Sequence, residues 1–249
     1  MRLDGKTIII TGATTGIGKA TAKLFAKKGA TVFNLDINKP DYALESVNFI
    51  KCDVSNFTSV KKAFAEISSK ADSIDYLFAN AGIHVFANLE DTSVEEIDKV
   101  IGINLKGILY TLKLTLPIMR EQKHGSIVLM GSDQSLVGKE QSAIYGTTKG
   151  AIAQLSKSTA LDYAKYSVRC NCVCPGTIET PLMHNAVRFF SEKTGTSKED
   201  IYASLKTAQP IQRLGKPEEI AEAVLFFCSD KSAFTTGASL SIDGGYTAK

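Results

Sequence analysis

The stretch TIIITGATTGIGKATAKLFAKKGATVFNLD, residues 7–36, decides the fold of this chain. It begins with a β-branched apolar run that ends at Thr11, and three glycines follow within seven residues. A run with apolar residues at helical spacing then stops at Gly29, and a second apolar run over residues 31–35 ends at Asp36. A strand, a glycine-rich turn, a helix and a strand within about thirty residues predict one parallel βαβ unit.

The glycine cluster between strand and helix indicates a site for a dinucleotide. Glycines let the backbone approach a pyrophosphate, whose negative charge is then stabilised by the amino end of the helix. Asp36 stands eighteen residues after Gly18, where a carboxylate can bind the hydroxyls of an adenosine ribose. It would repel a 2′-phosphate, and Thr14, Thr15 and Ile37 supply no compensating positive charge. We therefore expect NAD rather than NADP, and a loop aspartate without a ligand is the alternative interpretation of Asp36.

A second informative stretch covers residues 126–149. Residues 126–130 form a short apolar run typical of a buried strand, and Ser132 stands just past its carboxyl end. Open parallel sheets bind their ligands at that edge. Tyr145 and Lys149 are four residues apart on a predicted helix, so they project from one face. The pattern predicts that a hydroxyl, a phenol and an ammonium converge.

These three groups suit proton transfer to or from an alcohol or carbonyl oxygen. A free tyrosine has a pKa of about 10 and is a poor base at neutral pH. A nearby ammonium favours the phenolate, so we expect Lys149 to lower the pKa of Tyr145. Tyr145 could then exchange a proton with a substrate while Ser132 holds the same oxygen. The alternative is an ordinary Tyr-x-x-x-Lys pair on a helix surface.

Size and composition restrict the class of protein. A chain of 249 residues can bury one large core, and 44% hydrophobic residues are typical of a globular protein. The net charge is only +3, with basic and acidic residues intermixed, which gives no field for nucleic acid or a membrane surface. No apolar stretch approaches the ~18 residues that span a bilayer. The amino terminus has no apolar signal core, so we expect a cytoplasmic protein.

Three of the five cysteines, Cys170, Cys172 and Cys174, invite a metal interpretation. They alternate along a predicted strand, where residues i, i+2 and i+4 share one face. Three small apolar side chains on a buried face are the simpler interpretation, because thiols are often buried. Zinc sites usually use wider Cys-x-x-Cys pairs. We therefore expect neither a metal site nor a disulfide.

The remaining chain alternates between predicted strands and helices. Strands are expected over residues 47–54, 73–80, 167–173 and 234–243, and helices over residues 57–71, 93–116, 150–166 and after Pro217. This alternation predicts an α/β fold with a doubly wound Rossmann-type sheet, mostly or wholly parallel, with helices on both faces. No linker or internal repeat interrupts the chain, which indicates a single domain over residues 1–249.

The motif Thr11-Gly-x-x-x-Gly-x-Gly, with Ser132, Tyr145 and Lys149, resembles the classical short-chain dehydrogenase/reductase family over the whole chain. The resemblance implies that Asn104 is a fourth catalytic residue; a polar residue at a helix kink is the alternative. It also implies an Asn-Ala-Gly turn at residues 80–82, although Ala79 stands where asparagine is frequent, and a Pro-Gly turn at 175–176. The cofactor-binding residues that it implies are Gly12, Thr14, Thr15, Gly16, Ile17, Gly18, Asp36, Ile37, Asp53, Val54, Asn80, Ala81, Gly82, Tyr145, Lys149, Pro175, Gly176, Ile178 and Thr180.

Residues 181–211 have no clear place in the sheet, and in the family this region is a lid over cofactor and substrate. Arg188 could pair with a substrate carboxylate, or it could lie on a solvated helix face. His184 could take part in the chemistry, or it could be a neutral packing or surface histidine, since Tyr145 already fills the acid role. Asp133, Gln134 and Gln141 precede Tyr145 and favour a hydroxylated substrate. The predicted substrate residues are Ser132, Gln134, Tyr145, His184 and Arg188.

These patterns predict an oxidoreductase that transfers a hydride between NAD(H) and a secondary alcohol or ketone. The stretch RCNCVCPGT, residues 169–177, resembles family members acting on 3-hydroxybutyrate or sugar acids, so the expected substrate is a small polar hydroxy acid, polyol or sugar derivative. The alternatives are a carbonyl reductase of 3-oxoacyl or other hydrophobic ketones, a lyase or epimerase, and a non-catalytic NAD-sensing protein. The resemblance implies a homotetramer, with a dimer as the alternative.

Overall fold

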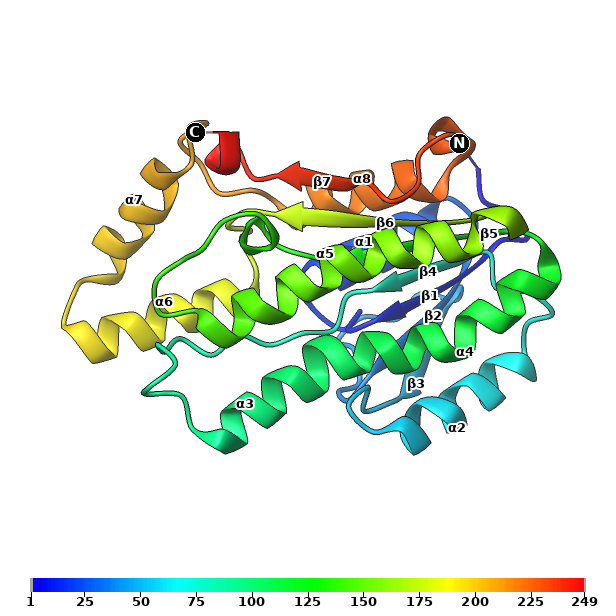
Figure 1. Cartoon of the computed structure of the whole chain (residues 1–249), viewed down its shortest axis with the longest axis horizontal. Coiled ribbons are helices and arrows are strands. Elements are labelled where there is room, and N and C mark those ends of the chain that lie inside the picture. The colour runs from blue at the N-terminus through cyan, green and yellow to red at the C-terminus, as the bar shows by residue number, and fades with distance from the viewer. Residues whose placement is uncertain (1, 249) are drawn as a thin grey trace.

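A computed structural model describes residues 2–248 and contains one seven-stranded parallel sheet of order β3-β2-β1-β4-β5-β6-β7 (Figure 1). The order reverses between β1 and β4, so the crevice at their carboxyl ends is the switch point of the sheet. The fold-class prediction, a single-domain Rossmann-type α/β fold, is confirmed; residues 1 and 249 of the predicted domain lie outside the described range. The strands are β1 Thr7–Thr11, β2 Thr31–Asp36, β3 Val47–Lys51, β4 Tyr76–Ala79, β5 Gly125–Met130, β6 Val168–Pro175 and β7 Ser239–Ile242.

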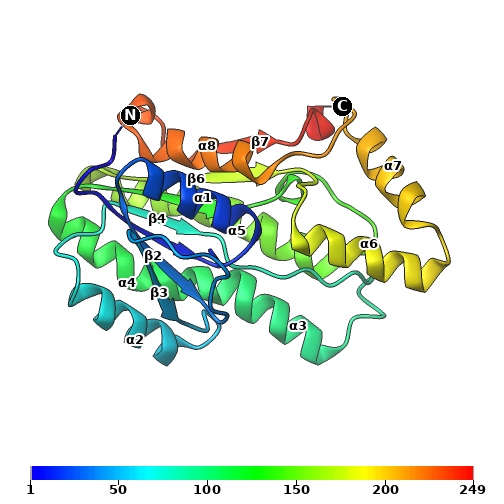
Figure 2. The ribbon, with the colours of Figure 1, turned by 180° about the vertical axis from the view of Figure 1, so that it is seen from behind.

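Helices cover both faces of the sheet. Helices α2, α4 and α5 lie over one face, and α1 and α8 pack together over the other (Figures 1 and 2). Helices α6 and α7 stand apart from the layers, beyond the end of the sheet toward which the strands point (Figure 1). The helices are α1 Gly16–Lys27, α2 Phe57–Ser68, α3 Val94–Val100, α4 Gly107–Gln122, α5 Ala143–Tyr163, α6 Pro181–Thr194, α7 Lys198–Ala208 and α8 Pro217–Cys228.

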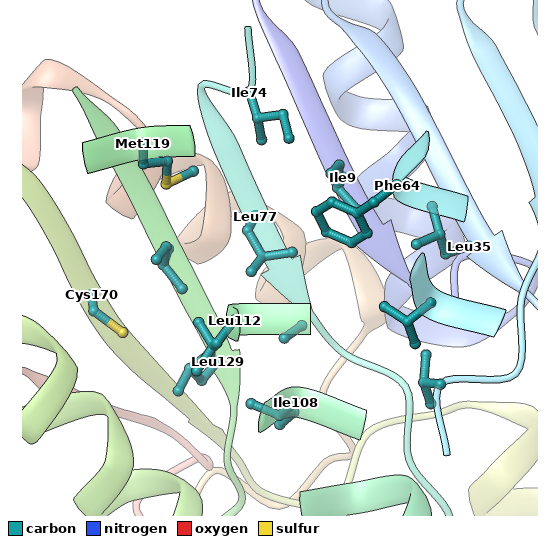
Figure 3. Close-up of a cluster of buried hydrophobic side chains, with 14 of the residues drawn as sticks. Ile9, Leu35, Phe64, Ile74, Leu77, Ile108, Leu112, Met119, Leu129 and Cys170 are labelled. Atoms are coloured by element: carbon teal, nitrogen blue, oxygen red, sulfur yellow. The ribbon is translucent and has the colours of Figure 1, made fainter. Parts of the chain in front are cut away.

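The strands are apolar runs because both of their faces are buried. In β1, Ile9 points into a core under α2 and α4, while Ile8 and Ile10 point into a second core on the opposite face. Figure 3 shows the first core, in which Phe64 and Leu77 lie near Ile9. The alternation along every central strand fixes the register, because a slip by one residue would exchange the two cores.

The predicted burial of Cys170, Cys172 and Cys174 on one face of a strand is confirmed. Cys170, Cys172 and Cys174 all point into the core under α4 and α5, and all five cysteines are buried and free. The Sγ atoms of Cys172 and Cys174 are 3.8 Å apart. Within residues 2–248 no group of three or more His, Cys, Asp or Glu side chains is arranged to hold a metal ion. Over the same range, no helix is long and apolar enough to cross a membrane.

The predicted helix over residues 93–116 is longer and less regular than expected. It begins at α3 with a capping box between Ser93 and Glu96, which satisfies two free backbone N–H groups. A π-helical turn, Ile101–Lys106, then leads into α4, which continues past Pro117 to Gln122. Such turns often occur at functional sites, and this one contains Asn104.

Other boundaries also differ from prediction. Helix α5 begins at Ala143, upstream of the expected start, so Tyr145 lies in its first turn. The last strand is only Ser239–Ile242, because most of the apolar residues before it lie in turns. Residues 181–211 contain two helices, which begin after the capping residues Thr180 and Ser197.

Candidate active site

The loop between β1 and α1 lines the floor of the main cavity, and its close contacts require glycine at Gly12 and Gly18. A Cβ atom on Gly12 would lie 2.9 Å from the Cα of Ala81, and Gly12 has a φ of +69°. A Cβ on Gly18 would lie 2.2 Å from the carbonyl oxygen of Gly12. The loop can therefore press against both the turn after β4 and the first turn of α1, as the glycine pattern predicted.

The amino end of α1 fits a phosphate group. Its N-cap residue, Thr15, makes no side-chain capping hydrogen bond, and no acidic residue stands in the first turn. Thr15, Gly16 and Ile17 line the main cavity. The backbone N–H groups at a helix start carry partial positive charge, so this end can stabilise a pyrophosphate.

Asp36 lies at the carboxyl end of β2 and is held by the backbone. Its Oδ2 accepts a hydrogen bond from the N–H of Thr14 at 3.1 Å, and its Oδ1 accepts one from the N–H of Asn38 at 3.0 Å. Each oxygen keeps a second acceptor position for a ribose hydroxyl. The nearby cation, Lys19, is paired with Asp41 at 2.6 Å. The site thus presents a carboxylate without a basic partner, which suits a ribose with a free 2′-hydroxyl.

The turn after β4 links this floor to the rest of the cavity. The Nδ2 atom of Asn80 donates to the carbonyl oxygens of Thr11 and Gly12, both at 3.0 Å. In return the hydroxyl of Thr11 accepts the N–H groups of Asn80 and Ala81. The carboxyl ends of β1 and β4 are therefore tied together at the switch point, beside the glycine loop.

The three residues expected to carry the chemistry meet at one place. Ser132 follows β5, and Tyr145 and Lys149 come from α5; all three line the cavity. The Ser132 hydroxyl lies close enough to Tyr145 to lower the pKa of its phenol, against the larger effect of burial. The Nζ atom of Lys149 donates to the carbonyl oxygen of Met130 at 2.7 Å and lies 5.4 Å from the centre of the Tyr145 ring.

The expected effect of Lys149 on Tyr145 is corrected by this geometry. Burial raises the pKa of Tyr145 to about 12, and the nearby Ser132 hydroxyl opposes that rise only in part. Burial also lowers the pKa of Lys149 to about 8. The ammonium donates to Met130 and not to the phenol, so its attraction for a phenolate is smaller than the cost of burying that charge. At neutral pH Tyr145 is a neutral phenol, ready to donate a proton.

Asn104 lies behind the trio and joins three segments. Its Oδ1 accepts the N–H of Ile83 at 2.8 Å, and its Nδ2 donates to the Ile83 carbonyl at 2.9 Å and to the Thr148 hydroxyl at 3.3 Å. Asn104 is fully buried and does not line the cavity. Its side chain therefore fixes the loop after β4 against α5, next to Lys149.

His84 was not singled out from the sequence. Its ring stacks on that of Tyr145, with centres 4.0 Å apart, and lies tilted against that of Phe86, with centres 3.8 Å apart. Its Nε2 atom is 2.6 Å from the hydroxyl of Ser142. Burial, assisted by the charges of Lys139 and Lys149, lowers the pKa of His84 to about 4, so the ring is neutral at pH 7. His84 meets Ser142 and Tyr145 only in the folded chain, so no local sequence pattern indicates these contacts.

A partly buried ion pair beside Ser132, between Asp133 and Lys139, was predicted only in part, because the sequence analysis did not single out Lys139. The Ser132 hydroxyl donates to Asp133 Oδ1 at 2.8 Å, and Lys139 Nζ is 2.6 Å from Asp133 Oδ2. Lys139 Nζ also lies 4.2 Å from the centre of the Tyr246 ring, near the carboxyl end of the chain. Asp133, Gln134 and Lys139 all line the cavity.

Two predicted substrate residues lie elsewhere. The Nδ1 atom of His184 is 2.6 Å from the Tyr202 hydroxyl, and Arg188 donates to Asn185 at 3.2 Å. Neither His184 nor Arg188 lines the cavity. The amphipathic helix α6 turns its apolar side inward, so polar residues at these positions face away. The residues of segment 181–211 that do line the cavity are Pro181, Leu182, Met183, Ala186, Val187, Phe190, Ile201 and Leu205.

One cavity of about 960 Å³ connects the glycine loop, the turn after β4 and the residues around Tyr145. It runs from Asp36 and Asp53, past the glycine loop, to Ser132 and Tyr145. Most of the residues assigned to the cofactor line it; Thr14 holds Asp36 from behind, and Gly18 packs under Gly12. The other lining residues in that group are Ile37, Val54, Asn80, Ala81, Gly82, Pro175, Gly176, Ile178 and Thr180. The shape and donors fit a dinucleotide whose nicotinamide end would lie near Tyr145.

Comparisons with known proteins agree with this architecture. A family model described as enoyl-(acyl carrier protein) reductase matches residues 12–247. The chain is 37% identical to an uncharacterized oxidoreductase of Thermotoga maritima, over 100% of both chains. It is 36% identical to dehydrogenase/reductase SDR family member 6 of Rattus norvegicus, over 99% of both chains. The ligand-free aldohexose dehydrogenase of Thermoplasma acidophilum superposes with a TM-score of 0.93 at 38% identity, over 99% of this chain and 96% of that one.

Proposed function

This chain belongs to the short-chain dehydrogenase/reductase family of oxidoreductases, and from that premise we propose that it transfers a hydride between NAD(H) and a secondary alcohol or ketone. The observation that carries the proposal is the single cavity joining the dinucleotide floor at Gly12 and Asp36 to Ser132 and Tyr145. When bound, the nicotinamide supplies or accepts the hydride. The chain's own residues then have to orient the substrate and move one proton.

Tyr145 is the proposed proton donor and acceptor. It is a neutral phenol at pH 7, so it can protonate a carbonyl oxygen that receives a hydride, and it must regain that proton in each turnover. Ser132 lies within hydrogen-bond reach of Tyr145 and can hold the same substrate oxygen. Lys149 places a buried positive charge next to the ring, which favours the charge that develops on Tyr145 during proton transfer.

NAD is the proposed cofactor rather than NADP. Asp36 is fixed by two backbone N–H groups at the ribose position, and Lys19 is already paired with Asp41. A 2′-phosphate would place about two negative charges beside an unneutralised carboxylate. Asn80, Pro175, Gly176 and Thr180 line the cavity between this position and Tyr145, where they could hold the middle of the dinucleotide.

The lid and the assembly are further parts of this proposal. We infer that residues 181–211 close over the substrate, because the apolar side of α6 and part of α7 form a wall of the cavity. The proposed homotetramer, with a dimer as the alternative, is supported by apolar side chains that stand open on α5 and near β7. Leu161 is 81% exposed and Phe234 is fully exposed. A cytoplasmic location stays a prediction from composition.

The proposed substrate is a small hydroxylated molecule, because Asp133, Gln134 and Lys139 make one cavity wall polar. The alternative is a carbonyl reductase of 3-oxoacyl or other hydrophobic ketones, in keeping with the description of the matching family model. Met183, Val187 and Leu205 would then contact an acyl chain.

The experiment that tests the proposal measures reduced nicotinamide by its absorbance, with NAD or NADP and a panel of polyols, aldoses, hydroxy acids and 3-oxoacyl thioesters. We expect turnover with NAD and hydroxylated substrates. Tyr145→Phe should lower kcat by about 10³-fold or more, while the Kd for NADH changes less than threefold. Retained turnover in Tyr145→Phe would reject the assigned proton donor. NADH binding without turnover of any panel member would favour the non-catalytic NAD-sensing alternative.

A further inference from the structure

A buried polar group beside Ser132 lacks the partner that its position requires. Within residues 2–248 the Oε1 atom of Gln134 has no hydrogen-bond partner, although the residue is only 9% exposed and lines the cavity. A Cβ on Gly146 would lie 3.3 Å from this oxygen, so the glycine leaves room around it. A buried acceptor without a donor is costly, which points to a donor on the molecule that enters the cavity.

The preceding residue, Asp133, lines the same cavity and offers a carboxylate with spare acceptor positions. Asp133 is 2% exposed, and its two oxygens accept single hydrogen bonds, one from Ser132 and one from Lys139. A carboxylate can accept about four, so each oxygen can take another donor. Lys139 is in turn held over the Tyr246 ring, so the pair is anchored from the carboxyl end of the chain. The wall formed by Asp133, Gln134 and Lys139 is named the polar wall.

The position of the polar wall relative to the reacting oxygen follows from Ser132. The Oγ atom of Ser132 accepts the N–H of Gln134 at 3.2 Å and donates to Asp133. An oxygen held by Ser132 and Tyr145 is therefore close to the Asp133 carboxylate. The Oε1 atom of Gln134 faces Gly146, the residue after Tyr145, and both Asp133 and Gln134 line the cavity. The group that meets the polar wall must be close to the reacting carbon, as a hydroxyl on the adjacent carbon is.

The charge of the polar wall selects against an anion. Lys139 lies 2.6 Å from Asp133, so the pair has no net charge, and Gln134 offers an acceptor. A substrate carboxylate would face two acceptors and no unpaired cation on this wall. Of the other lysines that line the cavity within residues 2–248, Lys149 donates to Met130, while Lys99 and Lys106 belong to the helical segment beside Ser55 and Val54, at the other end.

We infer that the polar wall is a subsite for the second hydroxyl of a vicinal diol, and that the substrate is a neutral polyol or aldose rather than a hydroxy acid. The inference deepens the proposed function and rests on it. The donor hydroxyl gives its hydrogen to Gln134 Oε1 or to Asp133, and Lys139 can donate back to the same hydroxyl. This arrangement rejects an analogue without that hydroxyl, because the buried acceptors are then left unpaired.

The test measures binding and not turnover, so it is independent of the assigned chemistry. The NADH-loaded protein, which cannot oxidise an alcohol, is titrated calorimetrically with trans-1,2-cyclohexanediol, cyclohexanol and 3-hydroxybutyrate. The diol should bind on the order of 10- to 100-fold more tightly than either of the other two. Glucose and 2-deoxyglucose provide the same comparison for an aldose.

Two variants locate the effect. Gln134→Leu removes the acceptor at similar size, and Asp133→Asn removes the charge while keeping the shape. Both should reduce the preference for the diol to less than about threefold. Gln154→Leu, on the exposed side of α5, is the matched control and should keep the preference. Equal binding of diol and cyclohexanol, tightest binding of 3-hydroxybutyrate, no binding of the diol, or a preference that survives both variants would each overturn the inference. The absorbance assay of the proposed function is unaffected by these outcomes.

Discussion

The two ends of the cavity are built from different materials. At the end near Asp36 the surface is mostly backbone: glycines that allow close approach, free N–H groups at the start of α1, and a carboxylate held by two backbone donors. At the end near Tyr145 the surface is made of buried side chains from four separate segments, among them His84, Ser132 and Lys149. At the first end, a side chain in place of Gly12 or Gly18 would clash with the neighbouring backbone. At the second end, burial sets the pKa values, and therefore the protonation states, of His84, Tyr145 and Lys149.

The difference has a consequence for stability. The backbone N–H groups at the start of a helix cost little free energy, because water can reach them. Burying the charged form of Lys149 or of His84 costs folding free energy. The end near Tyr145 is therefore expected to carry the trade-off between stability and activity. The following variants test that contrast, from the largest expected effect to the smallest.

Lys149→Met should lower activity strongly without lowering stability, which is the largest effect expected in this series. Loss of the ammonium beside Tyr145 should lower kcat by about 10²- to 10⁴-fold, measured as NADH formation. At pH 7 the free energy of unfolding should stay equal or rise by about 0–2 kcal/mol, because a charge whose burial lowers its pKa to about 8 is replaced by an apolar chain. Lys157→Met, on the exposed side of the same helix, should change neither quantity. A loss of several kcal/mol in the Lys149 variant would show that its bond to Met130 outweighs the cost of burial.

Asp36→Asn tests the other end of the cavity. The Kd for NADH should rise about 10- to 100-fold, and the preference for NADH over NADPH should shrink, because the charge that repels a 2′-phosphate is removed. Fluorescence titration with both cofactors measures this. Asp162→Asn removes an equal charge from the exposed side of α5 and should change each Kd less than threefold. An unchanged preference in Asp36→Asn would contradict the assignment of the ribose position.

His84→Gln should change how stability depends on pH. The folded-state pKa of His84 is about 4, below its unfolded value of 6.5, so the unfolded chain takes up a proton first as the pH falls. The stability that the neutral ring provides is present above pH 6.5 and is lost as the pH falls toward 4. Urea unfolding at pH 7 and pH 4.5 should show that the wild type loses roughly 1–3 kcal/mol more than the variant. His124→Gln, a partly exposed histidine, serves as the control.

Arg188→Ala should have the smallest effect. Arg188 contacts Asn185 on its own helix and does not line the cavity. We expect kcat/KM to change less than twofold for every substrate in the panel. A tenfold or larger loss confined to hydroxy acids would restore Arg188 as a carboxylate-binding residue and would count against the polar wall as the substrate subsite.

The same contrast explains what could be predicted from the sequence. The βαβ unit, the parallel sheet and the positions of Gly12 and Asp36 follow from patterns within thirty residues, because local periodicity and glycine spacing determine them. The proximity of Tyr145 and Lys149 could be predicted for the same reason, because they are about one helical turn apart. The wrong expectation concerned the pKa of Tyr145, since spacing gives proximity but not the burial that raises the value to about 12.

Contacts between distant segments account for the rest. His84 meets Tyr145 across 61 positions in the sequence, and Lys139 is held by Tyr246 near the opposite end of the chain. The rotation of α6 decides that Val187 and not Arg188 faces the cavity, and that rotation is set by packing against α7 and Leu214. No local signal encodes these arrangements, so the substrate end of the cavity could be only partly predicted.

The central claim, that one cavity brings NAD and an alcohol together at Tyr145, is tested most directly by isotope transfer. A polyol or aldose deuterated at the reacting carbon is incubated with NAD and the protein, and the reduced cofactor is analysed by mass spectrometry. We expect one deuterium per reduced nicotinamide with the wild type and none above background with Tyr145→Phe. Bound NAD that acquires no deuterium from any of the hydroxylated substrates would contradict it.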